Sequence, residues 1–577
     1  MSAVLEAREA SARYLAAVQP ALVRQFELLA TAQGAVSRLR DLILALAVQG
    51  KLVQQDARDE PASALLERIS AERDRLIAAG KLRQSKDSTA DDASQPPDPL
   101  PQGWAWSRLA AVGVINPRND AADDVVASFV QMSSIPVAFN ELNATEARPW
   151  RDIKSGFTQF AEGDVGVAKI TPCFENGKST VFQNLSNGIG AGTTELHIVR
   201  PLCGVAPRYV VLFLKSPRFL CKGEATMTGT AGQKRLPRTF FENCPFPLPP
   251  LAEQARIVAR VDELMRLCDA LEAKGRLEAE QHARLLGTLL GTLTGSSTPE
   301  ELAANWQRVA DHFDLLLDRP EAVDALEQTI LQLAVRGLLV PQDPSDQPAA
   351  SLVEPSTRGQ TSKIGSQTAL GAGLEAMSDA TELLPAGWKV VQLRQVAETR
   401  LGKMLDKAKN RGLPRPYLRN TNVQWRRFEL EDVKVMNLEQ SELAEFRLAP
   451  GDLLICEGGE PGRCAIWRDC EREMYFQKAI HRVRPRAGVA AEYIAIALEL
   501  DALSGALSAY FTGATIKHFV GQALQRYEFP LPPSAEQARI VARVTELRRL
   551  CANLRQRLTA SQTTQSHLAE ALVAEVA

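Results

Sequence analysis

The sequence lacks the motifs by which several classes of enzyme are recognised. It contains no GxxxxGK(S/T) phosphate loop, no HExxH zinc motif and no Asn-Pro-Pro-Tyr type motif for holding a flipped base. Its six histidines are scattered along the chain and form no hydrolase triad. We therefore expect that this chain has no catalytic residues of its own.

Paired cysteines and long apolar runs are missing as well. The nine cysteines include no CxxC pair, which favours reduced thiols in a cytoplasmic protein over a metal site or a disulfide framework. No apolar run reaches the roughly 18 residues of a membrane span. The first residues carry acids and lack the apolar core of a signal peptide. These features predict a cytoplasmic protein without a metal site.

The chain is long, and its charges nearly balance. With 577 residues it is too long for a single core, and we expect three to five domains. The 67 Lys and Arg residues face 69 Asp and Glu residues, so the net charge is −2. A nucleic-acid-binding role therefore requires basic residues gathered on particular surfaces.

The chain consists of two tandem copies of one unit. Residues 246–271 match residues 529–554 at 21 of 26 positions, and both stretches begin with Phe-Pro-Leu-Pro-Pro. Residues 36–65 match residues 323–352 at 16 of 30 positions. Shorter repeats are Leu-Pro-x-Gly-Trp at 100–104 and 384–388 and Thr-Gly at 228–229 and 512–513.

In each copy a proline-rich extended segment leads into a helix. The apolar residues of both helices step by four, three, four and three, which is the a/d pattern of a helix that needs a partner. We expect the two helices to share this seam, and docking of each helix on its own domain is the alternative. About 40 helical residues (251–290) would extend roughly 60 Å. The seam residues are Ile257, Val261, Leu264, Cys268 and Leu271 in one copy and Ile540, Val544, Leu547, Cys551 and Leu554 in the other.

These patterns divide the chain into six segments. Residues 14–48 and 62–79 have the pattern of helices that end at Gly50 and Gly80. The stretches between helices and middles are rich in Ser, Asp, Gln and Pro and read as linkers. We expect an N-terminal helical region with a linker (1–98), a first middle domain (99–249), a central helical region (250–341), a linker (342–383), a second middle domain (384–532) and a C-terminal helix (533–577).

The middle domains combine Gly-rich turns with short β-branched runs typical of strands. Residues 165–170, 195–200 and 452–455 are expected strands, and 209–215 and 493–500 are expected short helices. The predicted fold class is α+β, with two mixed α/β domains joined by long antiparallel coiled-coil helices in a pseudo-twofold tandem duplication. The two domains share only Gly-Asp at 163–164 and 451–452, His197 with His481, and Arg-Pro at 200–201 and 484–485. One scaffold therefore carries two different surfaces.

Three stretches have the composition of a nucleic-acid surface. Residues 400–427 hold nine Lys or Arg against a single Asp, together with Asn, Gln and aromatic residues. Lys and Arg attract phosphates, while Asn, Gln and Arg can read base edges. Residues 169–178 and 228–235 form polar, Gly-containing loops in which backbone amides can approach phosphates. An ordinary solvated surface is the alternative for all three.

Two Gly-rich stretches point to no chemistry. Residues 188–192 (Gly-Ile-Gly-Ala-Gly) resemble a fragment of a nucleotide loop but lack the strand-to-helix context and the acidic follow-on, so we expect a turn. Residues 457–462 hold two carboxylates with no third ligand at metal-binding spacing.

Taken together, these residues resemble the DNA specificity subunit of Type I restriction-modification enzymes. The resemblance covers nearly the whole chain and rests on two variable domains, each followed by a PLPPxAEQxxIV helix, and on the loops 168–178 and 451–463. It implies that each middle domain is a target-recognition domain for one half of a bipartite DNA sequence. It also implies that the helices set the spacer between the halves.

The same resemblance implies partners. These are double-stranded DNA, two methyltransferase (modification) subunits and two restriction subunits that act as translocase and nuclease. The methyltransferase subunits would dock on the helical regions near 1–80, 251–340 and 534–577. S-adenosylmethionine, ATP and Mg would be bound by the partners, and no cofactor by this chain.

The matching loops imply which residues contact DNA. For the first half-site these are Lys169, Thr171, Asn176, Lys178, Thr228, Gln233, Lys234 and Arg235. For the second half-site they are Lys403, Lys407, Arg411, Arg415, Tyr417, Arg419, Asn420, Asn422, Trp425, Thr512 and Lys517.

Two other classes of function compete with this interpretation. A self-contained nuclease or methyltransferase would turn over DNA when given only Mg²⁺ and S-adenosylmethionine. A scaffold that bridges two proteins would fail to shift any duplex, even with its partner present.

Overall fold

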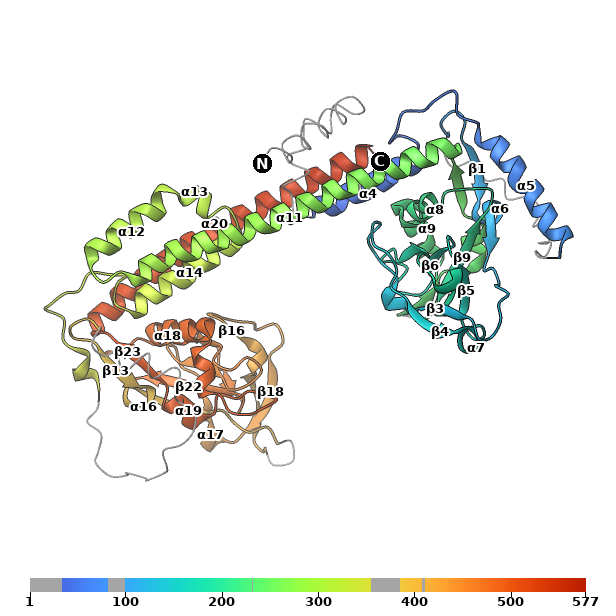
Figure 1. The fold of residues 1–577 in the computed structure, drawn as a ribbon. Helices are drawn as coiled ribbons and strands as arrows, with labels where there is room; N and C mark the ends of the chain where they lie inside the picture. Colours follow the sequence, from blue (N-terminus) through green and yellow to red (C-terminus); the bar gives the residue numbers. More distant parts are fainter. Residues whose placement is uncertain (1–33, 81–98, 231, 354–383, 407–409, 577) are drawn as a thin grey trace. The chain divides into compact units, whose positions relative to one another are not determined.

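The computed structural model describes residues 34–80, 99–230, 232–353, 384–406 and 410–576. The chain divides into two compact units, the first formed by residues up to 278 together with residues from 562 onward, and the second by residues 279–561. Each unit combines one middle domain with segments of helix (Figure 1). None of the helices in the described ranges has the length and apolar character of a membrane span.

The first middle domain is built on two four-stranded sheets. One has the order β2 (Gly113–Ile115), β9 (Leu196–Pro201), β6 (Val165–Ala168) and β7 (Ser179–Val181). The other has the order β4 (Glu146–Pro149), β3 (Val126–Val130), β8 (Ile189–Gly192) and β5 (Thr158–Ala161). A hairpin joins β10 (Thr228–Thr230) to β11 (Gln233–Arg235), and the helices are α6 (Leu109–Val112), α7 (Trp150–Ile153), α8 (Pro207–Lys215), α9 (Pro217–Thr226) and α10 (Arg238–Asn243).

The second middle domain repeats only the first of these sheets. Its four-stranded sheet has the order β14 (Ala397–Leu401), β22 (Ile480–Pro485), β19 (Leu453–Cys456) and β20 (Cys464–Ile466), which is the order β2-β9-β6-β7 of the other copy. Its second sheet has three strands, β18 (Lys434–Leu438), β15 (Leu413–Leu418) and β21 (Tyr475–Phe476). Further elements are the ribbon β16 (Val423–Gln424) with β17 (Arg427–Phe428) and the helices α16 (Leu393–Val396), α17 (Gln440–Phe446), α18 (Ala491–Ser504) and α19 (Gly521–Gln525). The two middle domains therefore share one four-stranded sheet and differ in the elements built beside it.

The helical regions agree with the sequence patterns where the structure describes them. The predicted helix 14–48 is described as α4 (Ala35–Val48), and its first part lies outside the described residues. The predicted helix 62–79 is α5 (Ala62–Ala78). The proline-rich segments lead into α11 (Leu251–Gly295) and α20 (Ser534–Val576), and α12 (Pro299–Asp311), α13 (Phe313–Leu316) and α14 (Pro320–Val335) lie between the copies in the chain.

The long helices run in opposite senses, because α11 begins in the first unit and ends in the second, while α20 begins in the second and ends in the first. The end of α20 brings Ala569 into the core of the first unit. The end of α11 brings Leu286, Leu290 and Leu293 into the core of the second. These placements confirm the predicted antiparallel arrangement.

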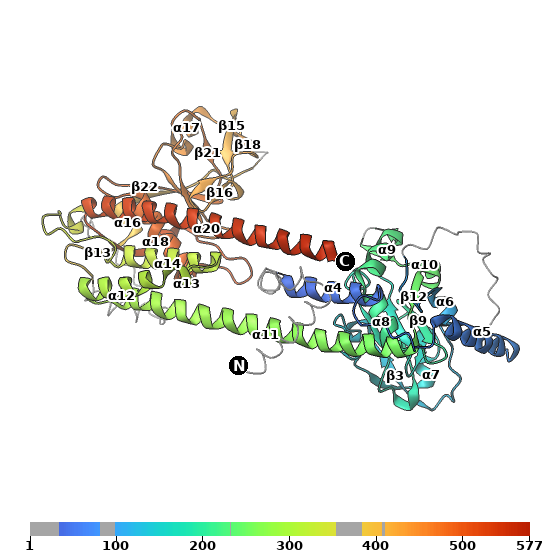
Figure 2. The same cartoon turned by 90° about the horizontal axis from the view of Figure 1, so that it is seen from above.

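The seam predicted between the two long helices is wrong, and the alternative holds. Ile257, Val261 and Cys268 are buried in the first unit with α4. The corresponding residues of the second copy, Ile540, Val544 and Cys551, are buried in the second unit with α14. In Figures 1 and 2, α4 lies along the first half of α11. Heptad spacing shows that a helix needs an apolar partner but does not name it, and here the partner is the amphipathic helix of the same copy.

The repeated AEQxR stretch fastens each long helix to its own middle domain. The Gln254 side chain accepts a 2.8 Å hydrogen bond from the backbone of Ala206, just before α8, and Gln537 accepts an equal bond from Ala490, just before α18. Two residues after each glutamine, Arg256 pairs with Asp59 at 2.6 Å in the first copy, and Arg539 pairs with Asp346 at 2.6 Å in the second. The repeat therefore encodes one docking geometry used twice.

In each copy, the proline and tryptophan of the repeated Leu-Pro-x-Gly-Trp motif pack against a glycine that follows the preceding helix, α4 or α14. Gly50 has a φ of +69°, and a Cβ there would lie 2.4 Å from the ring of Pro101. Gly337 has a φ of +71°, and a Cβ there would lie 2.5 Å from Pro385. Only glycine tolerates both the left-handed backbone and the close contact, which explains why it recurs in both copies.

Candidate DNA-recognition surfaces

The histidines shared by the two middle domains hold the same kind of loop in place. Nε2 of His197 lies 3.0 Å from the carbonyl oxygen of Leu236, directly after the β10–β11 hairpin. Nε2 of His481 lies 2.9 Å from the carbonyl oxygen of Phe519, directly after the loop 512–518. Burial lowers the pKa of both imidazoles, and the carbonyl contact offsets part of this effect. Each neutral imidazole thus holds a candidate DNA-facing loop against the four-stranded sheet that both domains share.

The shared Gly-Asp and Arg-Pro pairs form an ion pair in each domain. Arg200 contacts both carboxylate oxygens of Asp164 at 2.8 Å, and Arg484 contacts those of Asp452 at 2.6 and 3.0 Å. Both aspartates are buried, with 1% and 2% of their side chains exposed. Burial raises the pKa of Asp164, and the pairing with Arg200 opposes that rise. These contacts join β9 to the turn before β6, and β22 to the turn before β19.

The two loops predicted in the first middle domain lie together. Thr171 donates its backbone N–H to the carbonyl of Lys234 at 3.1 Å, and its hydroxyl contacts the Gly232 carbonyl at the same distance. The loop 169–178 therefore lies beside the β10–β11 hairpin, and together they form what we call the first candidate surface. Residues 228–230 and 233–235 are exposed along the hairpin.

The predicted residues of the first candidate surface divide into anchored and exposed side chains. The Lys178 ammonium donates to the Met132 carbonyl at 2.9 Å, and Arg235 forms an ion pair with Glu195 at 2.9 Å. Both cations are thus already partnered. Among the described residues, those that expose side chains without an ion pair are Lys169, which is half-buried, and Asn176, Thr228, Gln233 and Lys234.

The second candidate surface joins three loops of the second middle domain. Asn420 donates from its amide to the carbonyl of Gly458 at 3.3 Å, and the backbone of Phe519 donates to the carbonyl of Glu457 at 2.7 Å. Thr512 and His518 exchange two backbone hydrogen bonds of 2.9 Å, which closes the loop and leaves Lys517 exposed. Residues 420, 457–459 and 512–518 therefore lie together.

The basic window 400–427 is largely neutralised by acids from elsewhere in the same domain. Arg415 pairs with Glu473 at 2.8 Å, and Arg419 pairs with Asp432 at 2.6 Å. Lys403 pairs with Glu442. Arg411 is exposed and forms no ion pair within the described residues, whereas Lys407 lies outside them. The window therefore presents much less positive charge than its composition suggests.

Two predicted contact residues of this window are buried. Tyr417 is 6% exposed and belongs to the core around the three-stranded sheet of the second middle domain. Asn422 is 3% exposed, and its amide donates to the carbonyls of Glu429 and Asp432. We correct the prediction for both positions, because their side chains shape the loop from within and do not reach its surface.

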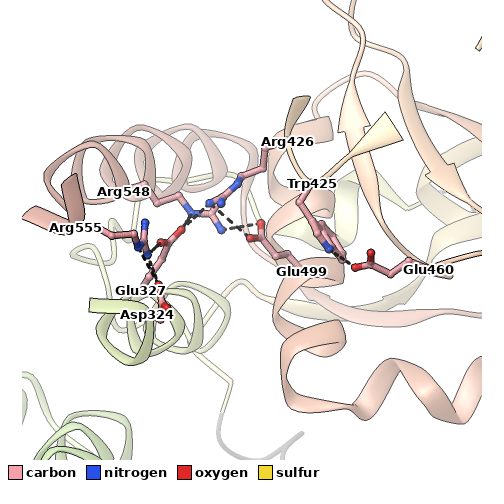
Figure 3. A network of polar contacts seen from close by, with 8 residues as sticks. All are labelled: Asp324, Glu327, Trp425, Arg426, Glu460, Glu499, Arg548 and Arg555. Atoms are coloured by element: carbon pink, nitrogen blue, oxygen red, sulfur yellow. Dashed lines mark hydrogen bonds and ion pairs between the residues drawn. The ribbon is translucent and has the colours of Figure 1, made fainter. Parts of the chain in front are cut away.

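Trp425 is bound within the second middle domain, next to the contact of that domain with the helices. Its indole N–H donates to Glu460 at 2.8 Å, and the neighbouring Arg426 pairs with Glu327 of α14 at 2.6 Å (Figure 3). Arg548 of α20 pairs with Glu499 at 2.7 Å and with Glu327 at 3.2 Å. Burial raises the pKa of Glu327, but its ion pairs outweigh that effect and keep the pKa below its usual range.

The comparisons with known proteins agree with this architecture. Residues 203–281 and 385–561 match the family described as Type I restriction modification DNA specificity domain. The chain is 39% identical over 549 residues to the Type I restriction enzyme EcoAI specificity subunit of Escherichia coli, covering 93% of both chains. It is 38% identical over 553 residues to the EcoEI specificity subunit of the same organism, with the same coverage.

The chain belongs to the specificity subunits of Type I restriction-modification systems. Its fold is similar to that of a chain in a structure titled as the basis of complex assembly and conformational transition of the type I R-M system. That similarity has a TM-score of 0.50 at 19% identity and covers 83% of this chain and 99% of the other.

This specificity subunit has one basic feature that the sequence did not reveal. Arg394, Arg400, Arg482, Arg484 and Arg486 line a cleft of about 400 Å³ beside β14 and β22, which we call the arginine cleft. Strand pairing sets Arg400 opposite Arg482 although 82 residues separate them in the chain. The carboxylates of Glu445 and Asp452, together with Glu398 in the cleft lining, compensate part of this charge.

The arginine cleft belongs to the second copy alone. At an offset of 284, four of its five positions are Ala110, Asn116, Ile198 and Leu202 in the first copy, and only Arg484 has an arginine equivalent, Arg200. No single stretch of sequence is unusually basic there, so only knowledge of the strand register would have exposed it. The specificity subunit therefore carries different charge on equivalent faces.

Within its described residues, the specificity subunit groups no three His, Cys, Asp or Glu side chains that could hold a metal ion. The buried Cys456 and Cys464 thiols have raised pKa values because of burial, which disfavours the reactive thiolate. The chemistry that the two candidate surfaces offer is hydrogen bonding and charge attraction toward phosphates and base edges.

Proposed function

We propose that this chain is the non-catalytic subunit that reads DNA sequence for a Type I restriction-modification complex, with one middle domain for each half of a bipartite target. The observation that carries the proposal is the pair of equivalent contacts between a buried histidine and a loop carbonyl. His197 and His481 hold unlike loops on equivalent sheets, so two different sequences can be read from one scaffold. Such an arrangement suits two unlike half-sites better than a symmetric one.

For the first half-site we propose that Lys234 and Lys169 contact phosphates, while Asn176 and Gln233 contact base edges. Exposed amides have the paired donor and acceptor that can distinguish bases, and lysines act as point charges toward the backbone. Lys178 and Arg235 position the loops, because each is already bound to a group of the protein.

For the second half-site we propose contacts from Asn420, Thr512, Lys517 and Arg411. We further propose that the arginine cleft attracts the phosphate backbone, because clustered arginines favour bidentate phosphate contacts. Arg415, Arg419 and Lys403 support the loops through their ion pairs.

We propose that α11 and α20 set the distance between the half-sites. Both are continuous, over 45 and 43 residues, and each connects one unit to the other. A helix has a fixed rise per residue, so a continuous helical connection favours one spacer length. Measuring affinity for duplexes whose spacer differs by single base pairs tests this proposal, and equal binding at all spacers would contradict it.

We propose that methyltransferase subunits dock on the helical regions. In the second unit, Trp306, Phe313 and Leu315 are exposed to 40%, 40% and 73%, an apolar group of the kind that partners cover. Replacing Leu315 with Asp is expected to reduce copurification of the methyltransferase subunit, while replacing the exposed Leu503 with Asp serves as a control. Equal recovery with both variants would contradict docking at this place.

The remaining partners follow from the same proposal. S-adenosylmethionine, ATP and Mg would be bound by methyltransferase and restriction subunits, and the complex would act on DNA in the cytoplasm. Mapping the modified adenines in the host genome would give both half-sites and the spacer.

The decisive experiment is a binding assay on that mapped duplex with the methyltransferase present. Replacing Lys234 with Ala should weaken binding to a duplex that retains only the first half-site, and replacing Lys517 with Ala should affect only the second. Lys389, which is exposed on strand β13 (Lys389–Gln392), is the matched control. Equal loss at both half-sites from either variant would contradict the assignment of one domain to each half.

A further inference from the structure

The two middle domains sit on their long helices through equivalent anchors. In addition to the Gln254 and Gln537 contacts, the hydroxyl of Tyr209 donates to the Pro247 carbonyl at 2.8 Å. The hydroxyl of Tyr493 donates to the Pro530 carbonyl at 2.9 Å. Since α8 and α18 are fixed at the same points, residues at equivalent positions on these helices face equivalent positions on α11 and α20.

The ion pairs at this contact have opposite polarity in the two copies, although the paired residues do not occupy equivalent positions. In the first copy Arg208 of α8 contacts both carboxylate oxygens of Asp262 on α11, at 2.6 and 2.7 Å. In the second copy Glu499 of α18 pairs with Arg548 of α20 at 2.7 Å. The middle domain therefore presents a cation to its long helix in one copy and an anion in the other.

The helix that precedes each middle domain shows the same reversal. Arg40 of α4 pairs with Asp269 and Glu272 of α11 at 2.7 Å each. At the position equivalent to Arg40, 287 residues later, Glu327 of α14 pairs with Arg555 of α20 at 3.1 Å. Arg555 is itself the equivalent of Glu272, so this ion pair is conserved in place and inverted in sign.

An exchange of the two middle domains would bring like charges together. The equivalent of Arg208 is Glu492, which would face Asp262 if the second domain occupied the first position. The equivalent of Glu499 is Lys215, so the opposite exchange would leave Arg548 without its Glu499 partner. Lys215 could not replace Glu499, because its ammonium already donates to the carbonyls of Pro136, Val137 and Gly177 within the first middle domain.

We propose that these inverted ion pairs match each middle domain to its own long helix, so that the two domains are not interchangeable between the two positions. The partner that each surface fits is an acidic helix in the first copy and a basic helix in the second. Like-charge contacts reject the wrong partner, while the correct ion pairs contribute less, as is usual for specificity based on charge.

A chimera of the full chain tests the proposal directly. Residues 105–245 are replaced with residues 389–528, so that the second middle domain occupies both positions between the repeated Trp and Phe residues. A second version adds the scaffold substitutions R40E, D262T, M265R and E272R, which are the residues of the second copy. The same four substitutions are also made in the natural chain.

The melting temperature of the first unit, followed by calorimetry, is expected to change in opposite directions. The four substitutions should raise it by about 3 °C in the chimera and lower it by a similar amount in the natural chain. A shift of the same sign in both chains, or no shift in either, would overturn the proposal.

Reversal of a single pair gives a result even if the chimera does not fold. R208E and D262R should each lower the melting temperature of the natural chain, and the double variant should recover most of that loss. Additive losses in the double variant would overturn the proposal. Reversing the exposed pair Arg238–Glu242 on α10 is the control, since that pair lies within one helix and is expected to leave the melting temperature unchanged.

Discussion

Nε2 of His481 lies 2.9 Å from the carbonyl oxygen of Phe519, and this contact fastens the loop 512–518 to the sheet of the second middle domain. The equivalent contact of His197 with Leu236 fastens the β10–β11 hairpin in the first. A buried neutral imidazole thus anchors each of the two candidate surfaces.

This contact predicts a dependence of stability on pH. Because burial keeps the pKa of folded His481 below its ordinary value of 6.5, the folded protein binds fewer protons than the unfolded chain just below that pH. The contribution of His481 to stability is therefore full above pH 6.5 and declines as the pH falls toward the lower, folded pKa. Urea unfolding of the natural chain and of H481Q at pH 7.5 and 5.5 measures the difference, and an equal loss in both proteins would contradict the prediction.

The buried ion pair between Asp452 and Arg484 predicts a large effect of substitution. D452A removes the partner of Arg484 and the acceptor of the Ala449 amide. The expected loss is about 3 kcal/mol of unfolding free energy, measured by chemical denaturation. E429A, which breaks the exposed pair with Arg427, should cost less than about 0.5 kcal/mol. Similar losses in the two variants would show that burial does not govern the contribution.

The repeated Thr-Gly pair predicts a position intolerant of a side chain. Gly513 has a φ of +98°, and a Cβ there would lie 2.1 Å from the Ile516 carbonyl oxygen. G513A should therefore distort the loop 512–518 and reduce affinity for the second half-site at least several-fold while sparing the first. Gly505, which has a φ of +81° but open space around its Cβ, is the matched control for backbone strain alone. Identical affinities for G513A and G505A would contradict the role assigned to this loop.

The exposed lysines predict a change in the salt dependence of DNA binding. Each phosphate contact from a lysine releases a counterion, so K517A should reduce the slope of log affinity against log salt concentration by about one. Titrations of the complex between 50 and 200 mM salt give that slope. An unchanged slope would show that Lys517 does not contact a phosphate.

Patterns local in sequence predicted the fold well, and contacts distant in sequence were not predicted. The repeats, the helix starts after Pro-Leu-Pro-Pro and the short strands depend on neighbouring residues and are confirmed. The partner of the helix seam was wrong, because Ile257 carries no information about which apolar face will cover it. Residues 188–192 were expected as a turn, but Ile189–Gly192 is strand β8, where Gly190 allows the Phe160 ring to pack closely.

The candidate site shows the same division. The loops that carry Thr171 and Lys234 were identified by composition, and the structure brings them together. The charge of the window 400–427 was overestimated because its partners, such as Glu473, lie some 60 residues away. The arginine cleft was missed because its members come from α16, from strands β14 and β22 and from the residue after β22, and no local pattern encodes the register that brings them together.

Ala569 comes from the last helix of the chain, yet it completes the core around α4 near the beginning, while Leu293 of the first copy completes the core around α14. Each copy of the duplication thus draws part of its core from the other copy. A substitution near the end of one long helix is therefore expected to loosen the interior of the opposite repeat.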